Sequence, residues 1–413
     1  MKIGIQTYGS RGDINPWIAL GQALARSGNQ VILYYTNYTG GDFSHYSENN
    51  LQVISTRKLN PTSDAYERVV VKKIYDLDIE SLTDYMVKEV FDLFENEMIL
   101  AGEHLCADND VLINNPNLYH TSCLAEKYQV PRINILVECQ FSPSNRVSQY
   151  RDEHINSYFL DRINDYRYSI NLPPVHNIRA EVFNSSWLNL LAYSRVFATD
   201  ENTWGDNYKL CGYFNLDNGQ SFELPKSLLV FLEQGPAPMF FSMGSLAFFE
   251  GRQFDILAIF LEAIALSGCR AIIQADWDNI EYVNPNNPDI FLIDYIPHEK
   301  ILPKCFGVVH HGGAGTSHAA LLSECPSIVI AYAWDQFYWG KELVRMGASA
   351  GILKRKYLEP VQLAGAIRSL IRDPEYKQNM LTIRRNIKRE KGPEKAVGYI
   401  QAVTNKLVLN AQT

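Results

Sequence analysis

The first forty residues alternate between short apolar runs and a helical pattern of apolar positions. Lys2–Thr7 has the composition of a buried strand, and it ends in a Gly/Ser turn at residues 9–12. Apolar side chains then recur every three or four residues to about Ser27, which predicts an amphipathic helix, and Val31–Tyr35 predicts the next strand. A strand–helix–strand unit of this length indicates two parallel strands.

The alternation continues through the first half of the chain. Val111–Asn114 and Arg132–Val137 predict strands on either side of a helix near Tyr119–Tyr128. Val196–Thr199 predicts the last strand of this half. The pattern therefore indicates a doubly wound α/β domain, whose ligands bind at the carboxyl ends of the strands.

Two stretches interrupt this pattern. Residues 60–104 are long, amphipathic and charged, which predicts helices inserted above the sheet, and residues 138–190 look irregular because of their prolines. Residues 215–235 have weak periodicity and many turn-forming residues, as expected of a linker between domains.

A second alternating series follows the linker. Its predicted strands are Met239–Ser242, Arg270–Gln274, Ile290–Asp294, Gly307–His310 and Ser327–Ala331. Its predicted helices cover Phe254–Leu266, a short stretch from Pro297, Gly315–Glu324, Gln336–Met346, Glu359–Ile371, Glu375–Glu390 and Pro393–Leu409. Since one core stops growing at roughly 250–300 residues, a chain of 413 residues fits two such domains.

Composition and charge narrow the classes of partner. The formal net charge is −8 and no long basic stretch occurs, which argues against a nucleic-acid partner. The seven cysteines form no CxxC motif and none has a histidine at metal-ligand spacing, so they indicate buried thiols in a reducing compartment. Without a signal peptide or an apolar run of about 18 residues, we expect a cytoplasmic protein with no transmembrane segment.

The sharpest chemical signal is the sequence HHGGAGT at residues 310–316, which follows a predicted strand and opens a predicted helix. Glycine and alanine leave the backbone accessible, and a helix N-terminus offers unpaired N–H groups and about half a positive charge. The two histidines and Thr316 add further donors. The combination favours a bound diphosphate, and the alternative is a tight turn that serves packing only.

This segment resembles the diphosphate-binding loop of inverting GT-B glycosyltransferases, in particular sterol glucosyltransferases and the bacterial enzymes that glycosylate glycopeptide and macrolide antibiotics. Residues 9–16 (GSRGDINP), 295–298 (YIPH) and 335–340 (DQFYWG) resemble further segments of these enzymes in the same order. The resemblance implies a GT-B fold, in which two Rossmann-like doubly wound parallel-sheet domains face each other across a cleft. It implies an acceptor-binding domain over residues 1–216 and a nucleotide-sugar-binding domain over 217–413, whose last helix packs back on the first.

The resemblance implies that Asp13 is the general base. Inverting transfer needs a carboxylate that takes the proton of the acceptor hydroxyl, on the side opposite the diphosphate. No histidine lies near this loop to form a His–Asp pair, so a single carboxylate is implied. The alternative is that Asp13 only caps the helix that follows. Ser10, Arg11 and Ser245 are weaker candidates for phosphate contacts, and Arg11 is equally compatible with a surface position.

The resemblance also implies the residues that bind the leaving nucleoside diphosphate, whose charge grows in the transition state. These are His311 and Thr316 with the backbone of Gly313, Ala314 and Gly315. No metal and no other cofactor is expected, because helix dipole and imidazole take the place of a metal's charge. Three Asp-x-Asp strings occur without the strand context that a metal site would need.

The remaining donor contacts follow from the other two segments. Tyr295 is expected to stack on the nucleobase, with His298 as a local cap or phosphate neighbour. Asp335 and Gln336 are expected to bind the sugar hydroxyls, although a helix N-cap is the alternative for this pair. The helix after the glycine loop lacks the glutamate that plant-type relatives place on the ribose, reading SHAA over residues 317–320, so UDP and TDP both stay open.

These assignments predict inverting transfer of a hexose from a nucleotide-diphosphate sugar to a hydroxyl of a small, apolar acceptor such as a sterol, lipid or other natural product. The acceptor pocket is expected in the first half, lined by residues from the 60–104 and 138–190 stretches, and peripheral membrane contact is an open alternative for an apolar surface near residues 60–104. Its candidate aromatic side chains, which serve equally well as core, are Tyr66, Tyr75, Tyr85, Phe91, Phe94, Phe141, Tyr158 and Phe159.

Three rival functions use the same features. A GT-B UDP-sugar epimerase shares the fold and donor but needs acidic residues around the sugar that the sequence does not identify. A Rossmann oxidoreductase needs a GxGxxG motif after the first strand, and the chain has GSRG there. A catalytically inactive nucleotide-sugar-binding subunit is less compatible with Asp13 and with the Asp335–Gln336 pair.

Overall fold

The computed structural model forms two compact α/β units. It describes residues 1–38, 41–60, 84–137, 146–198, 204–216, 222–244, 253–275, 287–332 and 335–411. Within these ranges, the first unit holds residues 1–60, 86–216 and 390–411, and the second holds 84–85 and 222–389. The chain thus leaves the first unit, builds the second and returns.

The first unit is built on a seven-stranded, wholly parallel sheet with the order β3-β2-β1-β4-β5-β6-β7. The strands are β1 Lys2–Gly9, β2 Gln30–Asn37, β3 Leu51–Ser55, β4 Val111–Asn114, β5 Arg132–Leu136, β6 Leu188–Leu191 and β7 Tyr208–Leu210. Most of their residues are buried, because helices cover both faces of a parallel sheet, and the apolar ones are joined by buried polar side chains such as Gln6, Asn114 and Asn134. The parallel register brings the carboxyl ends of β1 and β4 to one edge, where Ser10 and Asp13 follow β1.

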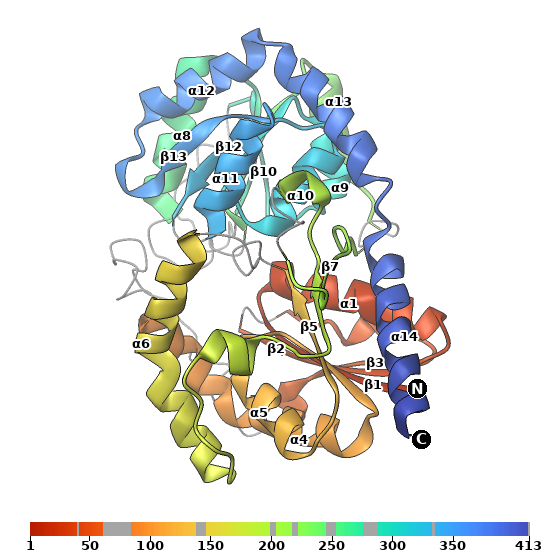
Figure 1. Ribbon diagram of the computed structural model, residues 1–413. Coiled ribbons are helices and arrows are strands. Elements are labelled where there is room, and N and C mark those ends of the chain that lie inside the picture. The colour runs from red at the N-terminus through yellow and green to blue at the C-terminus, as the bar shows by residue number, and fades with distance from the viewer. Residues whose placement is uncertain are drawn as a thin grey trace. The chain divides into compact units, whose positions relative to one another are not determined.

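Helices cover both faces of this sheet (Figure 1). The longer helices are α1 Arg11–Arg26, α4 Glu95–Asp108, α5 Tyr119–Lys127, α6 Arg146–Ser169 and α14 Gly392–Ala411. The short ones are η1 Ser44–Tyr46, η2 Thr56–Leu59, η4 Val87–Phe91, η5 Asp92–Phe94, η7 Arg179–Phe183 and η8 Arg195–Phe197. Helices α1 and α14 bury Trp17 and Ile400 in the main core, while α4 and α5 pack Leu105 and Leu124 on the opposite face.

The returning segment is tied down at its start. The Glu390 carboxylate accepts hydrogen bonds from Ser194 Oγ at 2.8 Å and from the Arg195 backbone N–H at 2.9 Å. Lys395 Nζ donates to the Leu210 carbonyl at 2.8 Å. Gly392 packs against the backbone that follows β7. A Cβ at this position would stand 2.4 Å from the Tyr213 carbonyl oxygen. These contacts set where α14 begins.

The second unit is built on a six-stranded parallel sheet with the order β10-β9-β8-β11-β12-β13. The strands are β8 Met239–Ser242, β9 Ala271–Gln274, β10 Ile290–Ile293, β11 Gly307–His310, β12 Ser327–Ala331 and β13 Ser349–Lys354. The helices are α7 Lys226–Glu233, α8 Gln253–Ser267, α9 His298–Ile301, η12 Leu302–Lys304, α10 Ala314–Leu322, α11 Asp335–Arg345, η13 Arg355–Tyr357, α12 Pro360–Arg372 and α13 Glu375–Ile387. Helices α8 and α12 cover one face, and α7, α9 and α10 cover the other.

The prediction of two parallel, doubly wound sheets is confirmed, but several local predictions are wrong. Val196–Thr199 was predicted as a strand, and η8 occupies Arg195–Phe197 instead, because Ser194 Oγ accepts from the Val196 N–H and starts a tight turn. Strands β3, β6, β7 and β13 are additional. Irregular structure was predicted over residues 138–190, where α6 forms, and the predicted linker contains α7.

Candidate functional site

The glycine-rich loop connects β11 to α10 and presents an uncapped helix N-terminus. Gly313 is the N-cap residue, and because it has no side chain the N-cap position makes no side-chain hydrogen bond to the N–H groups of the first turn, which is formed by Ala314, Gly315 and Thr316. Gly312 takes a positive φ of 88°, and a Cβ there would stand 2.8 Å from Val329 Cγ1. The loop therefore needs glycine for its conformation, and it leaves backbone donors that suit an anion.

The imidazole of His311 lies between two glycines. A Cβ on Gly313 would stand 2.3 Å from His311 Nε2, and a Cβ on Gly244 would stand 2.5 Å from His311 Cε1. Gly244, which follows β8, also takes a positive φ of 62°. Burial, with a smaller contribution from His298, lowers the pKa of His311 to about 4, and its buried Nδ1 has no hydrogen-bond partner within the part of the chain that the structure describes. At neutral pH the ring is uncharged and can offer one N–H to a ligand.

Two further histidines pack beneath the loop. His310 is fully buried, and its Nδ1 accepts a hydrogen bond from the Gly312 N–H at 3.1 Å, which fixes the turn. His298 packs edge-on against Phe240 at a ring distance of 5.8 Å. Burial lowers the pKa of His298 to about 4, and burial with the neighbouring His311 and His298 lowers the pKa of His310 well below its usual value. Both rings are therefore neutral parts of the loop's support, and the structure gives neither a charge to offer a phosphate at pH 7.

Residues 295–298, the segment expected to contact the nucleobase, expose the Tyr295 ring, but one of their backbone donors is already hydrogen-bonded within the protein. Tyr295 is 44% exposed and stands edge-on to Phe222. The backbone N–H of Ile296 donates to Gln274 Oε1 at 3.3 Å, so this donor already has a partner. A nucleobase stacked on Tyr295 would have to displace Gln274 to bond the Ile296 N–H, or form its hydrogen bonds with other groups.

Asp335 and Gln336 open α11, and each carries an internal hydrogen bond. Trp339 Nε1 donates to Asp335 Oδ2 at 2.9 Å, and the Tyr332 backbone N–H donates to Gln336 Oε1 at 2.7 Å. Trp339 is fully buried, as expected of a packing residue. The pair is thus held in a fixed orientation, and a sugar would meet a prearranged carboxylate and amide.

Trp339 also connects this pair to the glycine-rich loop. Its ring packs edge-on against His318 at 5.5 Å, and His318 Nδ1 lies 2.8 Å from the Ala314 carbonyl oxygen in the first turn of α10. Burial lowers the pKa of His318 to about 4. Neither His318 nor Trp339 was among the site residues expected from the sequence. The spacing of Asp335 and Trp339, one helical turn apart, was the available signal.

In the first unit, Asp13 completes a capping box at the start of α1. Its Oδ2 accepts hydrogen bonds from the Ser10 backbone N–H at 2.7 Å and from Ser10 Oγ at 2.9 Å. Burial raises the pKa of the Asp13 carboxyl despite these bonds. A Cβ on Gly9 would stand 2.5 Å from Asp13, so glycine is required there. The capping role is real, and a raised pKa is compatible with a basic carboxylate as well.

The weaker phosphate candidates are partly placed. The Arg11 guanidinium lies 5.1 Å from the centre of the Phe43 ring, a cation–π contact at the edge of the first sheet. Ser245 lies outside the described residues.

Some of the aromatic residues expected at the acceptor pocket are described by the structure and others are not. Tyr66, Tyr75 and Phe141 lie outside the described residues. Phe94 is core, at 1% exposure. Phe91 stacks on Tyr119 and on His120, at ring distances of 6.0 and 5.7 Å, and Tyr158 packs edge-on with Phe159 at 4.7 Å.

A charged network that sequence reasoning missed lies beside Phe91. Arg162 Nη2 contacts Asp92 Oδ1 at 2.6 Å and Glu95 Oε1 at 2.8 Å, and His120 Nε2 lies 2.8 Å from the same Glu95 oxygen. These bonds, that of His120 first, lower the pKa of Glu95 to about 2. The network joins η5, α4, α5 and α6 across up to 70 residues, so local patterns gave no signal for it.

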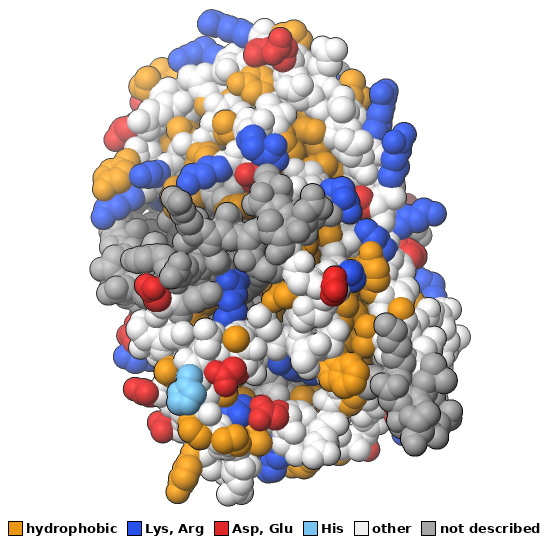
Figure 2. Space-filling model, viewed as in Figure 1, with side chains coloured by type: hydrophobic (Ala, Val, Ile, Leu, Met, Phe, Trp, Pro, Cys, Tyr) orange, Lys and Arg blue, Asp and Glu red, His pale blue; other side chains and the backbone are white. Residues whose placement is uncertain are grey.

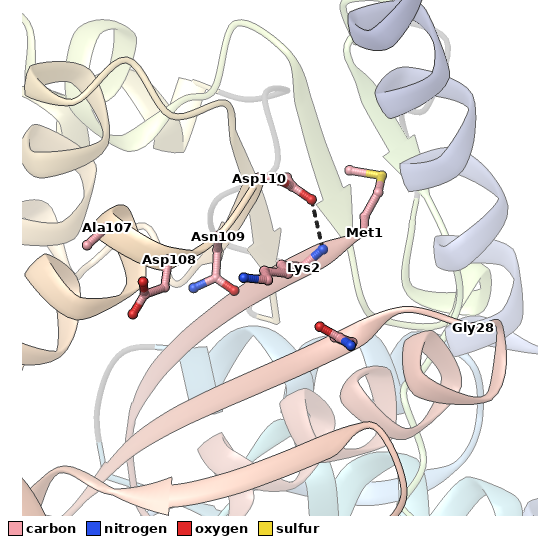
Figure 3. A pocket seen from close by; sticks show the side chains of 8 residues that line it. Met1, Lys2, Gly28, Ala107, Asp108, Asn109 and Asp110 are labelled. Atoms are coloured by element: carbon pink, nitrogen blue, oxygen red, sulfur yellow. Dashed lines mark hydrogen bonds between the residues drawn. The ribbon is translucent and has the colours of Figure 1, made fainter.

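A hollow of about 460 Å³ lies at the opposite, amino-terminal edge of the first sheet (Figure 3). It is lined by Met1, Lys2, Gly28, Gln30, Ala107, Asp108, Asn109 and Asp110. Asp110 accepts a hydrogen bond from the Lys2 backbone N–H at 2.8 Å. No residue with an expected catalytic or donor-binding role lines it. Among the described residues, no group of three or more His, Cys, Asp or Glu side chains is arranged to hold a metal, and no helix could span a membrane.

Comparison with known proteins agrees with this geometry. A family described as "Erythromycin biosynthesis protein CIII-like, C-terminal domain" matches residues 260–403. Among solved structures, the glycotransferase of kitacinnamycin superposes with a TM-score of 0.72 at 17% identity, covering 97% of this chain and 98% of that one. The glycosyltransferase VinC in complex with DTDP superposes with a TM-score of 0.68 at 16% identity, covering 98% of this chain and all of VinC. The fold is therefore GT-B.

Sequence relatives point to the same class. Sterol 3-beta-glucosyltransferase UGT80B1 of Arabidopsis thaliana is 26% identical over 96% of this chain and 67% of the relative. The chain spans only part of other such relatives. It covers 64% of the length of a second sterol 3-beta-glucosyltransferase from Arabidopsis thaliana and 34% of the length of one from Komagataella phaffii. The chain thus has the GT-B fold, and it is similar in sequence to glycosyltransferases over nearly its whole length.

Proposed function

We propose that the chain transfers a hexose from a UDP- or TDP-linked donor to a hydroxyl of a small, apolar acceptor, with inversion at the anomeric carbon. The observation that carries this proposal is the loop before α10, where an uncapped helix N-terminus stands beside the neutral His311 imidazole. The relatives named above support the donor class, since one was crystallised with DTDP.

In this mechanism the diphosphate lies on the first turn of α10. The N–H groups of Ala314 and Gly315, the Thr316 hydroxyl and one N–H of His311 donate to its oxygens. These donors are fixed before the reaction, so they stabilise the charge that grows on the leaving group without reorganising. Asp335 and Gln336 receive the sugar hydroxyls in the orientation that Trp339 and the Tyr332 backbone set.

Asp13 is the proposed general base. As the acceptor oxygen attacks the anomeric carbon, its proton passes to the Asp13 carboxylate, and the bond between that carbon and the diphosphate oxygen breaks. Attack on the face opposite the leaving group converts an α-linked donor into a β-glycoside. Ser10 holds one carboxylate oxygen through two hydrogen bonds, which orients the base.

The acceptor class rests on the relatives and on the first unit. Proteins described as sterol 3-beta-glucosyltransferases suggest a hydroxyl on a small, apolar molecule. The half-buried Tyr8, Tyr38, Phe91 and Leu93 gather beside the core that Phe94 and Met98 form, and they offer an apolar surface of the matching kind.

The first test is thermal stability with UDP, TDP, GDP and NAD, each added alone. A ligand at 100 times its dissociation constant stabilises the native state by about 2.7 kcal/mol. A shift of several degrees with UDP or TDP only supports the donor site and names the base. A shift with NAD alone, or with none of the four, overturns the proposal. The anomeric configuration of the product, read by NMR, then tests inversion.

A further inference from the structure

The chain's charge is distributed very unevenly. Residues 341–389 carry 12 Lys and Arg against 4 Asp and Glu, a net charge of +8, whereas the other residues together carry −16. This basic segment forms the end of α11, β13, η13, α12 and α13 in the second unit. A strong local excess in an acidic chain indicates an anionic partner, which the net charge of −8 conceals.

The same segment exposes large apolar side chains. Five of the fourteen large hydrophobic side chains exposed in the described residues belong to it. They are Val344, Tyr357, Val361, Ile371 and Leu381. Single exposed apolar residues are ordinary on a protein surface, but their concentration among lysines and arginines is not.

Exposed basic and apolar residues of this segment lie on β13, η13 and α12, which follow one another in the chain. Lys354 and Lys356 are exposed, and Lys356 Nζ lies 6.0 Å from the centre of the Tyr357 ring. Tyr357 and Val361 are each 65% exposed. Arg372 follows Val361 by eleven residues, or three helical turns, so both belong to the same stripe of α12. We call these five residues the basic–apolar surface.

The opposite stripe of α12 fixes the orientation of this surface. Leu363 and Ile367 are fully buried in the core shared with α8 and β13. On the outer stripe, a Cβ added at Gly365 would meet no atom within 4 Å. Helix α12 contains no acidic residue. In the face seen in Figure 2, lysine and arginine side chains lie beside apolar ones over the region that α12 and β13 occupy in Figure 1.

We propose that the basic–apolar surface docks the second unit on an anionic phospholipid bilayer. Lysines and arginines at a bilayer are attracted by its negative surface potential, while tyrosine and aliphatic side chains enter the interface between headgroups and acyl chains. A nucleic acid or an acidic protein could form ion pairs with the lysines and Arg372, but it would bury little apolar surface against Val361. Docking of this kind does not depend on the proposed transferase activity.

The test is cosedimentation with vesicles of phosphatidylcholine containing a third of phosphatidylserine, compared with phosphatidylcholine alone. Each lysine near an anionic surface changes partitioning about fivefold, so Lys354→Gln with Lys356→Gln should weaken binding roughly 25-fold. Tyr357→Ser with Val361→Ser should weaken binding at both low and high salt, because burial in lipid is not screened. Unchanged melting temperatures establish that both variants are folded.

The chain supplies a matched control. Lys127 and Tyr128 form the same neighbouring pair in the first unit, where Lys127 Nζ lies 5.2 Å from the Tyr128 ring centre and Tyr128 is 49% exposed. Lys127→Gln with Tyr128→Ser should leave vesicle binding unchanged. The proposal is overturned if the wild-type protein does not bind vesicles that contain phosphatidylserine, or if the control variant loses as much vesicle binding as the Lys354/Lys356 variant. It is also overturned if the protein binds duplex DNA as tightly as the vesicles while the Tyr357/Val361 variant keeps wild-type vesicle binding.

Discussion

Replacing Asp13 by Asn separates the two roles of this side chain, because Asn keeps an acceptor of the same shape. In the structure, Asp13 Oδ2 accepts from the Ser10 N–H and from Ser10 Oγ, and an Asn carbonyl oxygen can accept both bonds. The amide cannot take a proton. Loss of a general base costs about 10²- to 10⁴-fold in rate, or roughly 3–5 kcal/mol of transition-state stabilisation.

The effect on stability should be much smaller. The substitution removes a charge that favours the helix N-terminus by roughly 0.3–1 kcal/mol, and it also removes the burial penalty that raises the Asp13 pKa. These contributions oppose each other, so the free energy of unfolding should change by less than about 1 kcal/mol. Ser10→Ala is the matched control. It removes one capping bond and keeps the carboxylate, so it should cost roughly 1 kcal/mol of stability and less than tenfold in rate.

The assay combines kcat/KM for transfer, the dissociation constant of UDP or TDP, and urea unfolding on both variants. In wild type, kcat/KM should rise with pH through the raised pKa of Asp13, because the carboxylate form is the base, and this limb should vanish in Asp13→Asn. The reasoning fails if Asp13→Asn keeps more than a tenth of wild-type kcat/KM, or if Ser10→Ala loses as much rate as Asp13→Asn. Either result would reduce Asp13 to a helix cap.

Three further predictions concern the second unit. Gly313→Ala should displace the His311 ring and weaken nucleotide binding at least tenfold by calorimetry, while Gly365→Ala, which meets open space, should not; equal effects would refute the packing argument. Trp339→Phe removes the hydrogen bond to Asp335, so kcat/KM for the sugar donor should fall roughly 10- to 100-fold while the dissociation constant of the free nucleoside diphosphate stays unchanged. Burial lowers the pKa of three histidines here to about 4, so the unfolded chain binds more protons between pH 4 and 6.5. The free energy of unfolding should therefore increase as the pH is raised from 4 to 6.5, by up to about 1.4 kcal/mol per pH unit for each fully responding histidine. A urea midpoint that stays constant across this window would contradict those pKa values.

Local patterns predicted much of the architecture. The strands Val111–Asn114 and Gly307–His310 were predicted at their observed bounds, because a short apolar run between turn residues is typical of a strand buried on both faces of a parallel sheet. The glycine-rich loop and the start of α1 were likewise recognisable, since helix N-termini depend on the few residues around them. The strand predicted at Val196–Thr199 failed because one serine hydroxyl, bonded to a nearby N–H, outweighed a weak apolar run.

The sequence by itself therefore determined the class of fold, the position of the glycine-rich loop and the identity of the candidate base, because each depends on residues that are neighbours in the chain. Only the tertiary structure decided how these groups are held. Gln274 Oε1 accepts the hydrogen bond of the Ile296 N–H. The His311 ring lies between Gly244 and Gly313, which are 69 positions apart in the chain. Burial then makes that histidine neutral. Such contacts depend on which surfaces pack together, and packing is chosen by the whole core, so no local pattern contains it.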